Sequence, residues 1–262
     1  MLKLAGKTIL ITGGSSGIGL ALATQLLQRG NTVIVTGRDA QALQRTQQAL
    51  PHCHVVQSDV SDPTAIVELH AAVMAQFPQL DVLINNAGIM RAIELTRDQP
   101  NDRHDLQDIT REIDINLSGP IRMVQQFLPH LMSRQQAAII NVSSVLAYVP
   151  YPLFPVYSAT KAALHAYTQS LRVQCRHTNV RVIELAPPGV QTPLLQNAFK
   201  DVSRRQDGMD VDHLARMTIA AIEAGSVEIR PGISNAVRWL SRIAPQFTLN
   251  QIAKLGKLKT RR

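Results

Sequence analysis

Short apolar runs alternate along this chain with longer stretches whose apolar residues recur at helical spacing. Residues 8–12 are apolar or β-branched, and Ile18, Leu22 and Leu26 follow them at intervals of four. That spacing places the three side chains on one face of a helix, which Gly30 is expected to end. The chain therefore begins with a predicted strand, a glycine-rich turn and a predicted helix.

The same alternation continues through most of the chain. Ser61, Asp62 and Pro63 are typical of a helix N-terminus with proline in the first turn. Further strands are expected at residues 32–36, 54–57, 81–84, 138–142 and 180–185. The intervals between them are long enough for crossover helices. This βαβ series predicts an α/β protein with a three-layer Rossmann fold, a doubly wound and mostly parallel sheet with helices on both faces.

Length and composition fit one domain followed by a basic tail. The chain has 262 residues, 45% of them hydrophobic and 18% charged, which is an ordinary globular balance. We predict a single Rossmann-type domain over residues 1–240 and a tail over 241–262. Residues 89–110 are polar and long enough to form a variable loop.

The net charge of +8 comes from the C-terminal end. No acidic residue follows Glu228, whereas eight Lys and Arg residues do, so the rest of the chain has nineteen basic and nineteen acidic residues. The charge therefore gives no indication of a nucleic-acid-binding core. Ile252, Leu255 and Leu258 with their neighbouring lysines fit an amphipathic helix on an anionic membrane, but a solvated terminus is the expectation.

Cysteine usage and the N-terminal segment favour a soluble, cytosolic protein. The two cysteines, Cys53 and Cys175, form no C-x-x-C pair and have no clustered histidines, so neither a disulfide framework nor a metal site is expected. Neither a cleavable apolar leader nor an apolar run of about eighteen residues is evident. We expect a cytoplasmic protein.

The first turn has the chemistry needed to hold a pyrophosphate. It runs from Thr12 to Gly19 as T-G-G-S-S-G-I-G, and its glycines permit main-chain N–H groups and a helix N-terminus to face an anion. The G-x-x-x-G-x-G spacing differs from G-x-G-x-x-G, but the strand before and helix after it are the same. A plain glycine turn is the alternative. The predicted cofactor contacts here are Gly13, Ser15, Ser16, Gly17, Ile18 and Gly19.

Arg38 at the end of the second strand favours NADP. No carboxylate is placed there to accept hydrogen bonds from a free ribose 2′-hydroxyl, and a guanidinium suits a 2′-phosphate. In the alternative interpretation, Arg38 is a surface cation and Asp39 has the cofactor role. NAD is the second cofactor candidate.

Polar and small residues follow the third and fourth predicted strands. Asp59, with Val60 beside it, suits an adenine amino group. Asn86, Ala87 and Gly88 allow close approach of the backbone to a cofactor. These residue types also favour turns for purely local reasons.

Tyr157 and Lys161 are the strongest catalytic candidates. On a helix, residues four apart lie on one face, so the ammonium group is expected to lower the pKa of the phenol from about 10. That suits a tyrosine that exchanges protons near neutral pH. Ser143 lies fourteen residues before Tyr157, after an apolar strand. Taken alone, a Y-x-x-x-K pair is more often a solvated surface pair.

Together these segments resemble the short-chain dehydrogenase/reductase family. The matching motifs, in order over the first 195 residues, are T-G-x-x-x-G-I-G at 12–19, N-N-A-G at 85–88, Asn116, Ser143 and Y-x-x-x-K at 157–161. The segments I-N-N-A-G-I, A-A-I-I-N-V-S-S and E-I-R-P-G are similar to the DltE-like oxidoreductases within that family.

The resemblance implies a role for each catalytic candidate. Tyr157 would be the general acid in carbonyl reduction and the base in alcohol oxidation. Ser143 would bind the substrate oxygen, while Lys161 would lower the tyrosine pKa and hold the nicotinamide ribose. Asn116 would support a proton-relay water. For Ser143 or Asn116 alone, a capping or core role is the commoner one.

A loop after the sixth predicted strand resembles the family's P-G loop. Val190 and Thr192 would hold the nicotinamide carboxamide, with Pro188 and Gly189 shaping the turn. The extra Pro187 departs from the family pattern and changes the loop in detail.

The predicted activity is hydride transfer between NADP and a small-molecule carbonyl or secondary alcohol. The resemblance also implies a homodimer or homotetramer and no nucleic-acid partner. An apolar pocket wall for a smallish hydrophobic substrate is expected from Leu146, Tyr148, Val149, Tyr151, Leu153 and Phe154, which equally fit packing under a loop. The alternative function is a non-catalytic NADP(H)-sensing regulator that acts on a partner protein.

Overall fold

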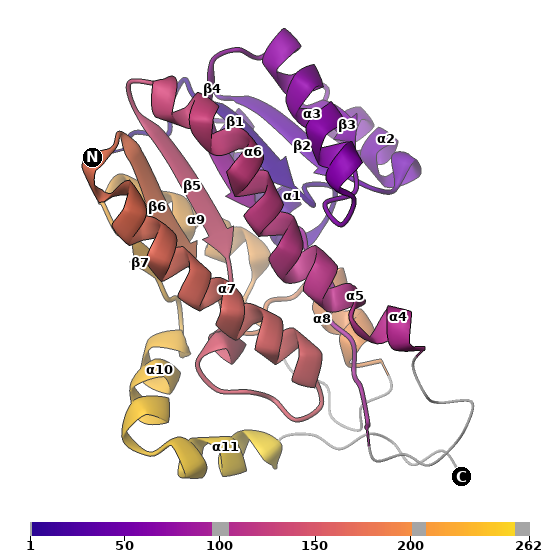
Figure 1. Cartoon of the computed structure of the whole chain (residues 1–262), viewed down its shortest axis with the longest axis vertical. Helices are drawn as coiled ribbons and strands as arrows, with labels where there is room; N and C mark the ends of the chain where they lie inside the picture. Colours follow the sequence, from indigo (N-terminus) through magenta and orange to yellow (C-terminus); the bar gives the residue numbers. More distant parts are fainter. Residues whose placement is uncertain (1, 96–104, 201–207, 255–262) are drawn as a thin grey trace.

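Seven parallel strands form one sheet through the centre of the molecule (Figure 1), in the order β3-β2-β1-β4-β5-β6-β7. The computed structural model describes residues 2–95, 105–200 and 208–254. Every neighbouring pair of strands is parallel. The strands are β1 (Thr8–Thr12), β2 (Thr32–Gly37), β3 (His54–Gln57), β4 (Leu80–Asn85), β5 (Ala137–Val142), β6 (Val180–Leu185) and β7 (Glu228–Ile229).

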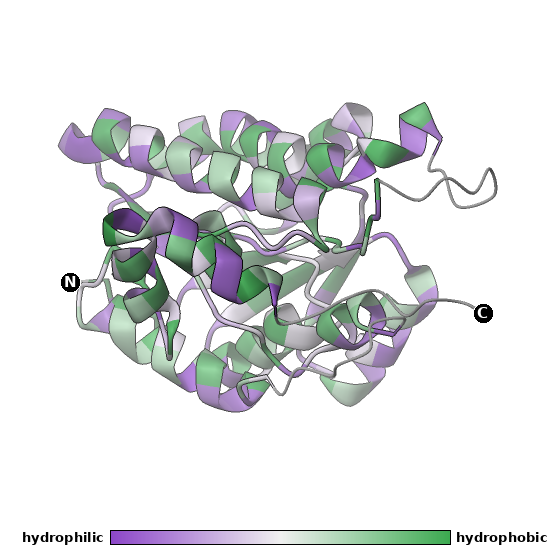
Figure 2. Cartoon of the chain, turned by 90° about the horizontal axis from the view of Figure 1, so that it is seen from below, coloured by the Kyte–Doolittle hydropathy of each residue, from purple (hydrophilic) through white to green (hydrophobic). Residues whose placement is uncertain are grey.

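Helices cover both faces of the sheet, which confirms the predicted fold class. One hydrophobic core joins the sheet to α1, α2 and α9, and a second joins it to α3, α6 and α7. Figure 2 shows the two helical layers with the sheet between them. The helices are α1 (Gly17–Leu27), α2 (Ala40–Ala49), α3 (Pro63–Gln76), α4 (Leu106–Ile109), α5 (Arg111–Ile113), α6 (Gly119–Ser133), α7 (Pro155–Gln174), α8 (Pro193–Ala198), α9 (Val211–Glu223), α10 (Ser234–Ile243) and α11 (Pro245–Ala253).

Local sequence explains where these elements begin. All five residues of β1 are buried, because helices cover both of its faces. In α1, Leu22 and Leu26 are fully buried at helical spacing, as predicted. Asp62 caps α3 by accepting a hydrogen bond from the backbone N–H of Thr64, and Pro63 occupies the first turn. The six predicted strands are confirmed, with ends that move by at most one residue.

The order in which strands are added to the sheet reverses between β1 and β4. The chain runs outward from β1 to β2 and β3, and then returns to place β4 on the other side of β1. The crossover helices diverge at such a switch point, which leaves a crevice beyond the carboxyl ends of the strands. The first glycine-rich turn and the segment after β4 both lie there.

Helical structure continues past the predicted domain boundary at residue 240. That boundary falls inside α10, and α11 follows directly (Figure 1). Arg230 and Arg238 both pair with Glu228, so these two cations belong to the body of the protein. Ile252 packs against a third hydrophobic cluster near the crevice. Leu255 and Leu258, named for the membrane alternative, lie outside the described residues.

Two other predictions concern regions that are described in part. Within the predicted loop at 89–110, Leu106–Ile109 form the helix α4, which Asp105 caps, and residues 96–104 lie outside the described part. In the described ranges, no helix is long and apolar enough to cross a membrane, and no cluster of three or more His, Cys, Asp or Glu side chains is arranged to hold a metal ion.

Candidate active site

A cavity of about 650 Å³ lies at the carboxyl ends of the strands. This volume suits a small-molecule or cofactor site. Nearly all predicted site residues line it: Gly13, Ser15, Ser16, Gly17, Ile18, Arg38, Asp59, Val60, Asn86, Ala87, Gly88, Ser143, Tyr157, Lys161, Pro188, Gly189, Val190 and Thr192. Of the predicted residues, Gly19 and Asn116 stand behind this lining.

The glycine-rich turn has no room for a side chain at Gly13 or Gly19. Gly13 has a φ of +64°, and a Cβ there would lie 2.8 Å from the Cα of Ala87. A Cβ on Gly19 would lie 2.4 Å from the carbonyl oxygen of Gly13. The turn therefore brings bare backbone and the N-terminus of α1 to the cavity, which fits a pyrophosphate.

Asn86 holds this turn from the neighbouring strand. Its Nδ2 donates to the carbonyl oxygens of Thr12 and Gly13, each at 3.0 Å. The Thr12 hydroxyl in turn accepts from the backbone N–H groups of Asn86 and Ala87. The sequence predicted Asn86 as a cofactor contact, and the structure adds that it fixes the β1 turn against the β4 turn.

Arg38 and Asp39 differ at the outer end of the cavity. The exposed residues Arg38 and Asp39 both line the cavity, and the Asp39 carboxylate also caps α2 by accepting from the Ala42 N–H at 3.0 Å. Burial raises the pKa of Asp59, but hydrogen bonds from Ser61 and the positive charges of Arg38 and Arg111 outweigh it, so the pKa lies below its ordinary value. A positive side chain thus faces this end while Asp39 is engaged by its own helix.

Tyr157 and Lys161 lie on α7 and face the cavity. Both are buried, and Lys161 Nζ lies 5.6 Å from the centroid of the Tyr157 ring. Burial raises the pKa of the phenol to about 12; a hydrogen bond with Ser144 opposes this rise, and the charge of Glu112 adds to it. The pKa of Tyr157 therefore lies above its ordinary value in this structure, because desolvation of the phenolate dominates, and the lowering by Lys161 stays a prediction.

Burial also shifts the pKa of the Lys161 ammonium group. Desolvation lowers its pKa to about 8, and the negative charge of Glu184 opposes that change. Nζ donates to the carbonyl oxygen of Val142 at 2.8 Å. The lysine is thus anchored to the end of β5 rather than to the tyrosine hydroxyl.

Two adjacent serines after β5 point to different partners. Ser143 Oγ donates to Glu184 Oε1 at 2.5 Å, in the space between the sheet and α7. The Ser144 hydroxyl is hydrogen-bonded to Tyr157 and also accepts from the Leu146 N–H at 3.1 Å. The hydroxyl beside the phenol is therefore that of Ser144, and the sequence prediction selected its neighbour.

The sequence contained a signal for this exchange. Successive side chains of an extended chain point to opposite sides, so the two hydroxyl groups of a Ser-Ser pair meet different partners. The backbone N–H of Ser143 still bonds to the Leu185 carbonyl oxygen, which continues the β5–β6 ladder and turns Ser143 toward the sheet partner Glu184.

Asn116 lies in a π-helical turn, Asp114–Ser118, between α5 and α6. Its side chain is fully buried and bonds both the N–H and the carbonyl oxygen of Ile89, each at 2.9 Å, and donates to Thr160 at 3.2 Å. π-turns often mark functional sites. Here the asparagine fixes the segment after β4 against α7, and the relay role implied by the family stays a prediction.

The P-G loop closes the cavity opposite the glycine turn. Val190 forms a parallel bridge with Met209, and the Thr192 hydroxyl caps α8 by accepting from the Leu195 N–H at 3.3 Å. A Cβ on Gly17 would lie 3.1 Å from the Thr192 methyl group. The loop and the first turn are therefore in near contact across the cavity.

An apolar wall extends the cavity beyond Tyr157. Tyr151, Phe154 and Phe199 pack edge to face or tilted, with centroids 5.0 to 6.2 Å apart. Four of the predicted wall residues line the cavity, namely Leu146, Val149, Tyr151 and Phe154. Tyr148 instead packs on His165, and Leu153 lies in the cluster behind the lining. Residues that sequence reasoning missed complete the wall: Leu195, Phe199, Ile233, Val237 and Ile252.

Comparison with known proteins agrees with this geometry. Residues 7–203 match the family described as short chain dehydrogenase. The chain belongs to that family. It is 40% identical over 228 residues to the uncharacterized oxidoreductase DltE of Bacillus subtilis, covering 87% of this chain and 89% of the relative. The predicted similarity to DltE-like oxidoreductases is thereby confirmed.

Solved structures of short-chain dehydrogenases share the whole architecture. One from Burkholderia cenocepacia, in complex with NADP, has a TM-score of 0.81 and 25% identity, covering 96% of this chain and 99% of its own. One from Burkholderia phymatum, in complex with NAD, has a TM-score of 0.82 and 24% identity, covering 94% and 96%. This short-chain dehydrogenase therefore has neighbours that bind either nucleotide.

Proposed function

We propose that this short-chain dehydrogenase reduces an uncharged apolar ketone or aldehyde with NADPH, or oxidises the matching secondary alcohol. The observation that carries the proposal is the Tyr157 phenol, which is hydrogen-bonded to Ser144. This phenol lines the same cavity as the apolar wall and the glycine-rich turn at residues 12–19, which we call the glycine cradle. A nicotinamide cofactor, when bound, supplies the hydride donor or acceptor.

The residues of the cavity fit such a cofactor along its length. The α1 N-terminus and the glycine-rich turn suit the pyrophosphate, and Asp59 lines the part of the cavity that would hold the adenine. Tyr157 and Lys161 lie at the opposite end of the cradle, beside the P-G loop. The preference for NADP rests on the positive charge of Arg38 at this end of the cavity, while one oxygen of the neighbouring Asp39 carboxylate caps α2.

The protonation states favour proton donation by Tyr157. A phenol with a pKa of about 12 stays protonated at neutral pH, so it is ready to donate its proton to a substrate oxygen. Ser144, rather than Ser143, is the hydroxyl placed to bind that oxygen. Lys161, protonated below a pKa of about 8, provides positive charge near the developing phenolate.

The substrate side of the cavity indicates the chemical class of the molecule. The described residues that line it beyond Tyr157 are mainly apolar or aromatic, and none of them is charged. A charged substrate would lose its hydration there without an ionic partner. We therefore extend the proposal to uncharged, apolar carbonyl compounds.

The alternative of a non-catalytic NADP(H) sensor has no structural observation in its favour. A sensor has no use for a phenol and a hydroxyl paired beside the cradle. A homodimer or homotetramer and a cytoplasmic location stay predictions.

A carbonyl panel followed by NADPH absorbance tests the proposal, with Tyr157→Phe as the decisive variant. The variant should bind NADPH normally, measured by nucleotide fluorescence, while turnover falls by about 10³-fold or more because no proton donor remains. Residual turnover within about tenfold of wild type would remove Tyr157 from the mechanism.

A further inference from the structure

A row of polar side chains crosses the sheet beneath α7. Asn85, Asn141, Glu184 and Glu228 are direct register partners on β4, β5, β6 and β7. The first three are at most 2% exposed. Polar groups at this depth cost free energy unless they are hydrogen-bonded, so the row needs a purpose or a full set of partners.

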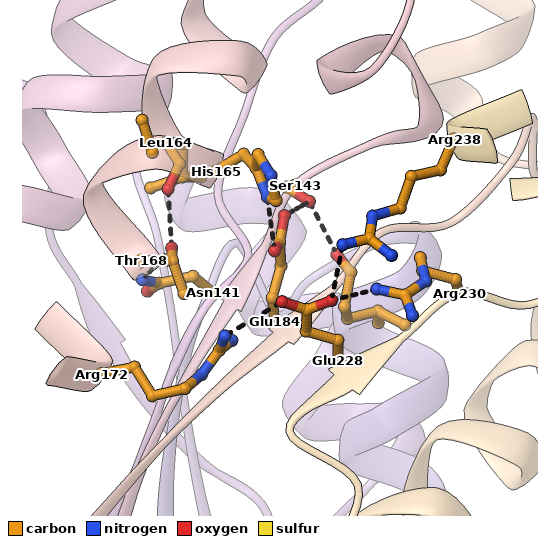
Figure 3. A network of polar contacts seen from close by, with 12 residues as sticks. Asn141, Ser143, Leu164, His165, Thr168, Arg172, Glu184, Glu228, Arg230 and Arg238 are labelled. Atoms are coloured by element: carbon orange, nitrogen blue, oxygen red, sulfur yellow. Dashed lines mark hydrogen bonds and ion pairs between the residues drawn. The ribbon is translucent and has the colours of Figure 1, made fainter. Parts of the chain in front are cut away.

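Helix α7 supplies a partner to three members of this row (Figure 3). Asn141 donates to Thr168 at 2.9 Å, and Glu228 pairs with Arg172 at 3.1 Å. Glu184 Oε2 accepts from His165 Nδ1 at 2.7 Å. The row is thus built against one face of the helix that carries Tyr157 and Lys161.

Glu184 is the member that has no Lys or Arg side chain within ion-pair distance in the described part of the chain. Glu228 faces three guanidinium groups, from Arg172, Arg230 and Arg238. Glu184, with a side chain that is 1% exposed, has a serine hydroxyl and a histidine ring instead. A buried carboxylate needs an opposite charge close by, or it takes up a proton.

Lys161 is linked to Glu184 through residues at the end of β5 and is the candidate for that opposite charge. It precedes His165 by one helical turn, so the two side chains leave α7 on the same face. Its Nζ bonds to the carbonyl oxygen of Val142, the residue next to Ser143, whose hydroxyl bonds to Glu184. The Lys161 ammonium group and the Glu184 carboxylate are thus hydrogen-bonded to two consecutive residues, Val142 and Ser143, at the end of β5.

We infer that Glu184 is a positioning residue, a buried counter-ion that keeps Lys161 protonated, with Ser143 and His165 holding its two carboxylate oxygens in place. The function of Lys161 in turnover rests on the proposed function. The pKa of Lys161 agrees with the geometry, because Glu184 acts against the lowering caused by burial.

Other charged and titratable groups around Glu184 have partners of their own. Tyr148 lies against His165, and the positive charge of Arg230 opposes the rise that burial causes in the pKa of its phenol. Arg230, Arg172 and Arg238 all contact Glu228 (Figure 3). Removing the Glu184 charge therefore acts on its direct partner His165 and on Lys161, rather than on these arginines.

The test measures the titration of Lys161 itself. In protein labelled with ¹³Cε-lysine, the Lys161 NMR signal is identified by its loss in Lys161→Met. In Glu184→Gln, which keeps the side-chain shape, its titration midpoint should fall by about one pH unit or more relative to wild type. The matched control is Glu228→Gln, one strand away at the same level, which should leave the midpoint unchanged.

A midpoint in folded Glu184→Gln that coincides with wild type overturns the inference. If Glu184→Gln does not fold, Ser143→Ala decides, because it releases one oxygen of Glu184 and should move the midpoint in the same direction by a smaller amount. An unmoved midpoint there overturns the inference too. The NMR measurement needs no substrate. It therefore tests the effect of Glu184 on Lys161 even if the protein reduces no carbonyl compound.

Activity provides a second readout once a substrate is known. The alkaline fall in kcat should begin at lower pH in Glu184→Gln, because Lys161 loses its proton earlier. If the role of Glu184 were purely structural, Glu184→Gln would lower the melting temperature and leave the pH at which kcat begins to fall unchanged.

Discussion

The nucleotide end and the substrate end of the cavity are built on different principles. At the nucleotide end, a short segment with glycine at Gly13 and Gly19 exposes bare backbone, and its neighbours across the crevice are the β4 turn and the P-G loop. At the substrate end, side chains from segments spread between Leu146 and Ile252 pack into one wall.

This difference teaches where specificity resides in the molecule. Backbone N–H groups and a helix N-terminus recognise a phosphate whatever side chains surround them. The apolar wall belongs to a hydrophobic cluster separate from the two main cores, so its side chains can differ without disturbing the sheet. The cradle thus defines the cofactor class, and the wall defines the substrate.

The largest expected effect separates the two adjacent serines between these ends. Ser144→Ala should lower kcat by about 10²–10³-fold, because it removes the hydroxyl beside Tyr157. Ser143→Ala is the matched control, with a clearly smaller loss, because its hydroxyl faces Glu184. Steady-state kinetics of both variants decide the assignment. A larger loss in Ser143→Ala would restore the original sequence prediction.

Gly19→Ala should break the nucleotide end alone. The added methyl group would lie 2.4 Å from the Gly13 oxygen and 2.5 Å from Asn86 Nδ2, so the cradle must shift. An overpacking cost of about 1–3 kcal/mol corresponds to an NADPH affinity about 10- to 100-fold weaker. Fluorescence titration measures it, and Gly37→Ala is the control, since its Cβ would meet nothing closer than 3.4 Å. Equal affinities in the two variants would argue against the cradle.

Arg38→Ala sharpens the prediction at the outer edge of the nucleotide end. NADPH affinity should fall by about tenfold while NADH affinity stays constant, because only NADPH has a 2′-phosphate for the guanidinium to bind. Arg45→Ala, on the exposed side of α2, is the control. A constant ratio of the two affinities would refute the role given to Arg38.

Ile252→Ala should produce the smallest effect, at the far side of the wall. KM for a large apolar substrate should rise by about three- to tenfold from the lost apolar contact, with NADPH affinity unchanged. Ile243→Ala, on the exposed part of α10, serves as the control. Identical kinetics in both variants would place Ile252 outside the substrate contact.

The glycine cradle, the six strand positions, Arg38 and the α7 pair could be predicted because each depends on a short stretch of chain. Strand alternation, helix spacing and glycine placement act over a few residues. The same local reasoning failed for Ser143, because which of two adjacent hydroxyls meets Tyr157 depends on how β5, β6 and α7 come together. It failed likewise for Phe199 and Ile252, which join the wall only through the path of the chain after β6.

The sequence by itself determined the doubly wound fold and the family, and it predicted the glycine-rich turn, Tyr157 and Lys161 as site residues, since these follow from periodicity and from motifs of fixed spacing. Only the tertiary structure decided the charges and partners around them. Burial raises the pKa of Tyr157 and lowers that of Lys161, and register places Glu184 beside Ser143. Desolvation and strand register arise only when distant segments pack, which is why no local pattern contained them.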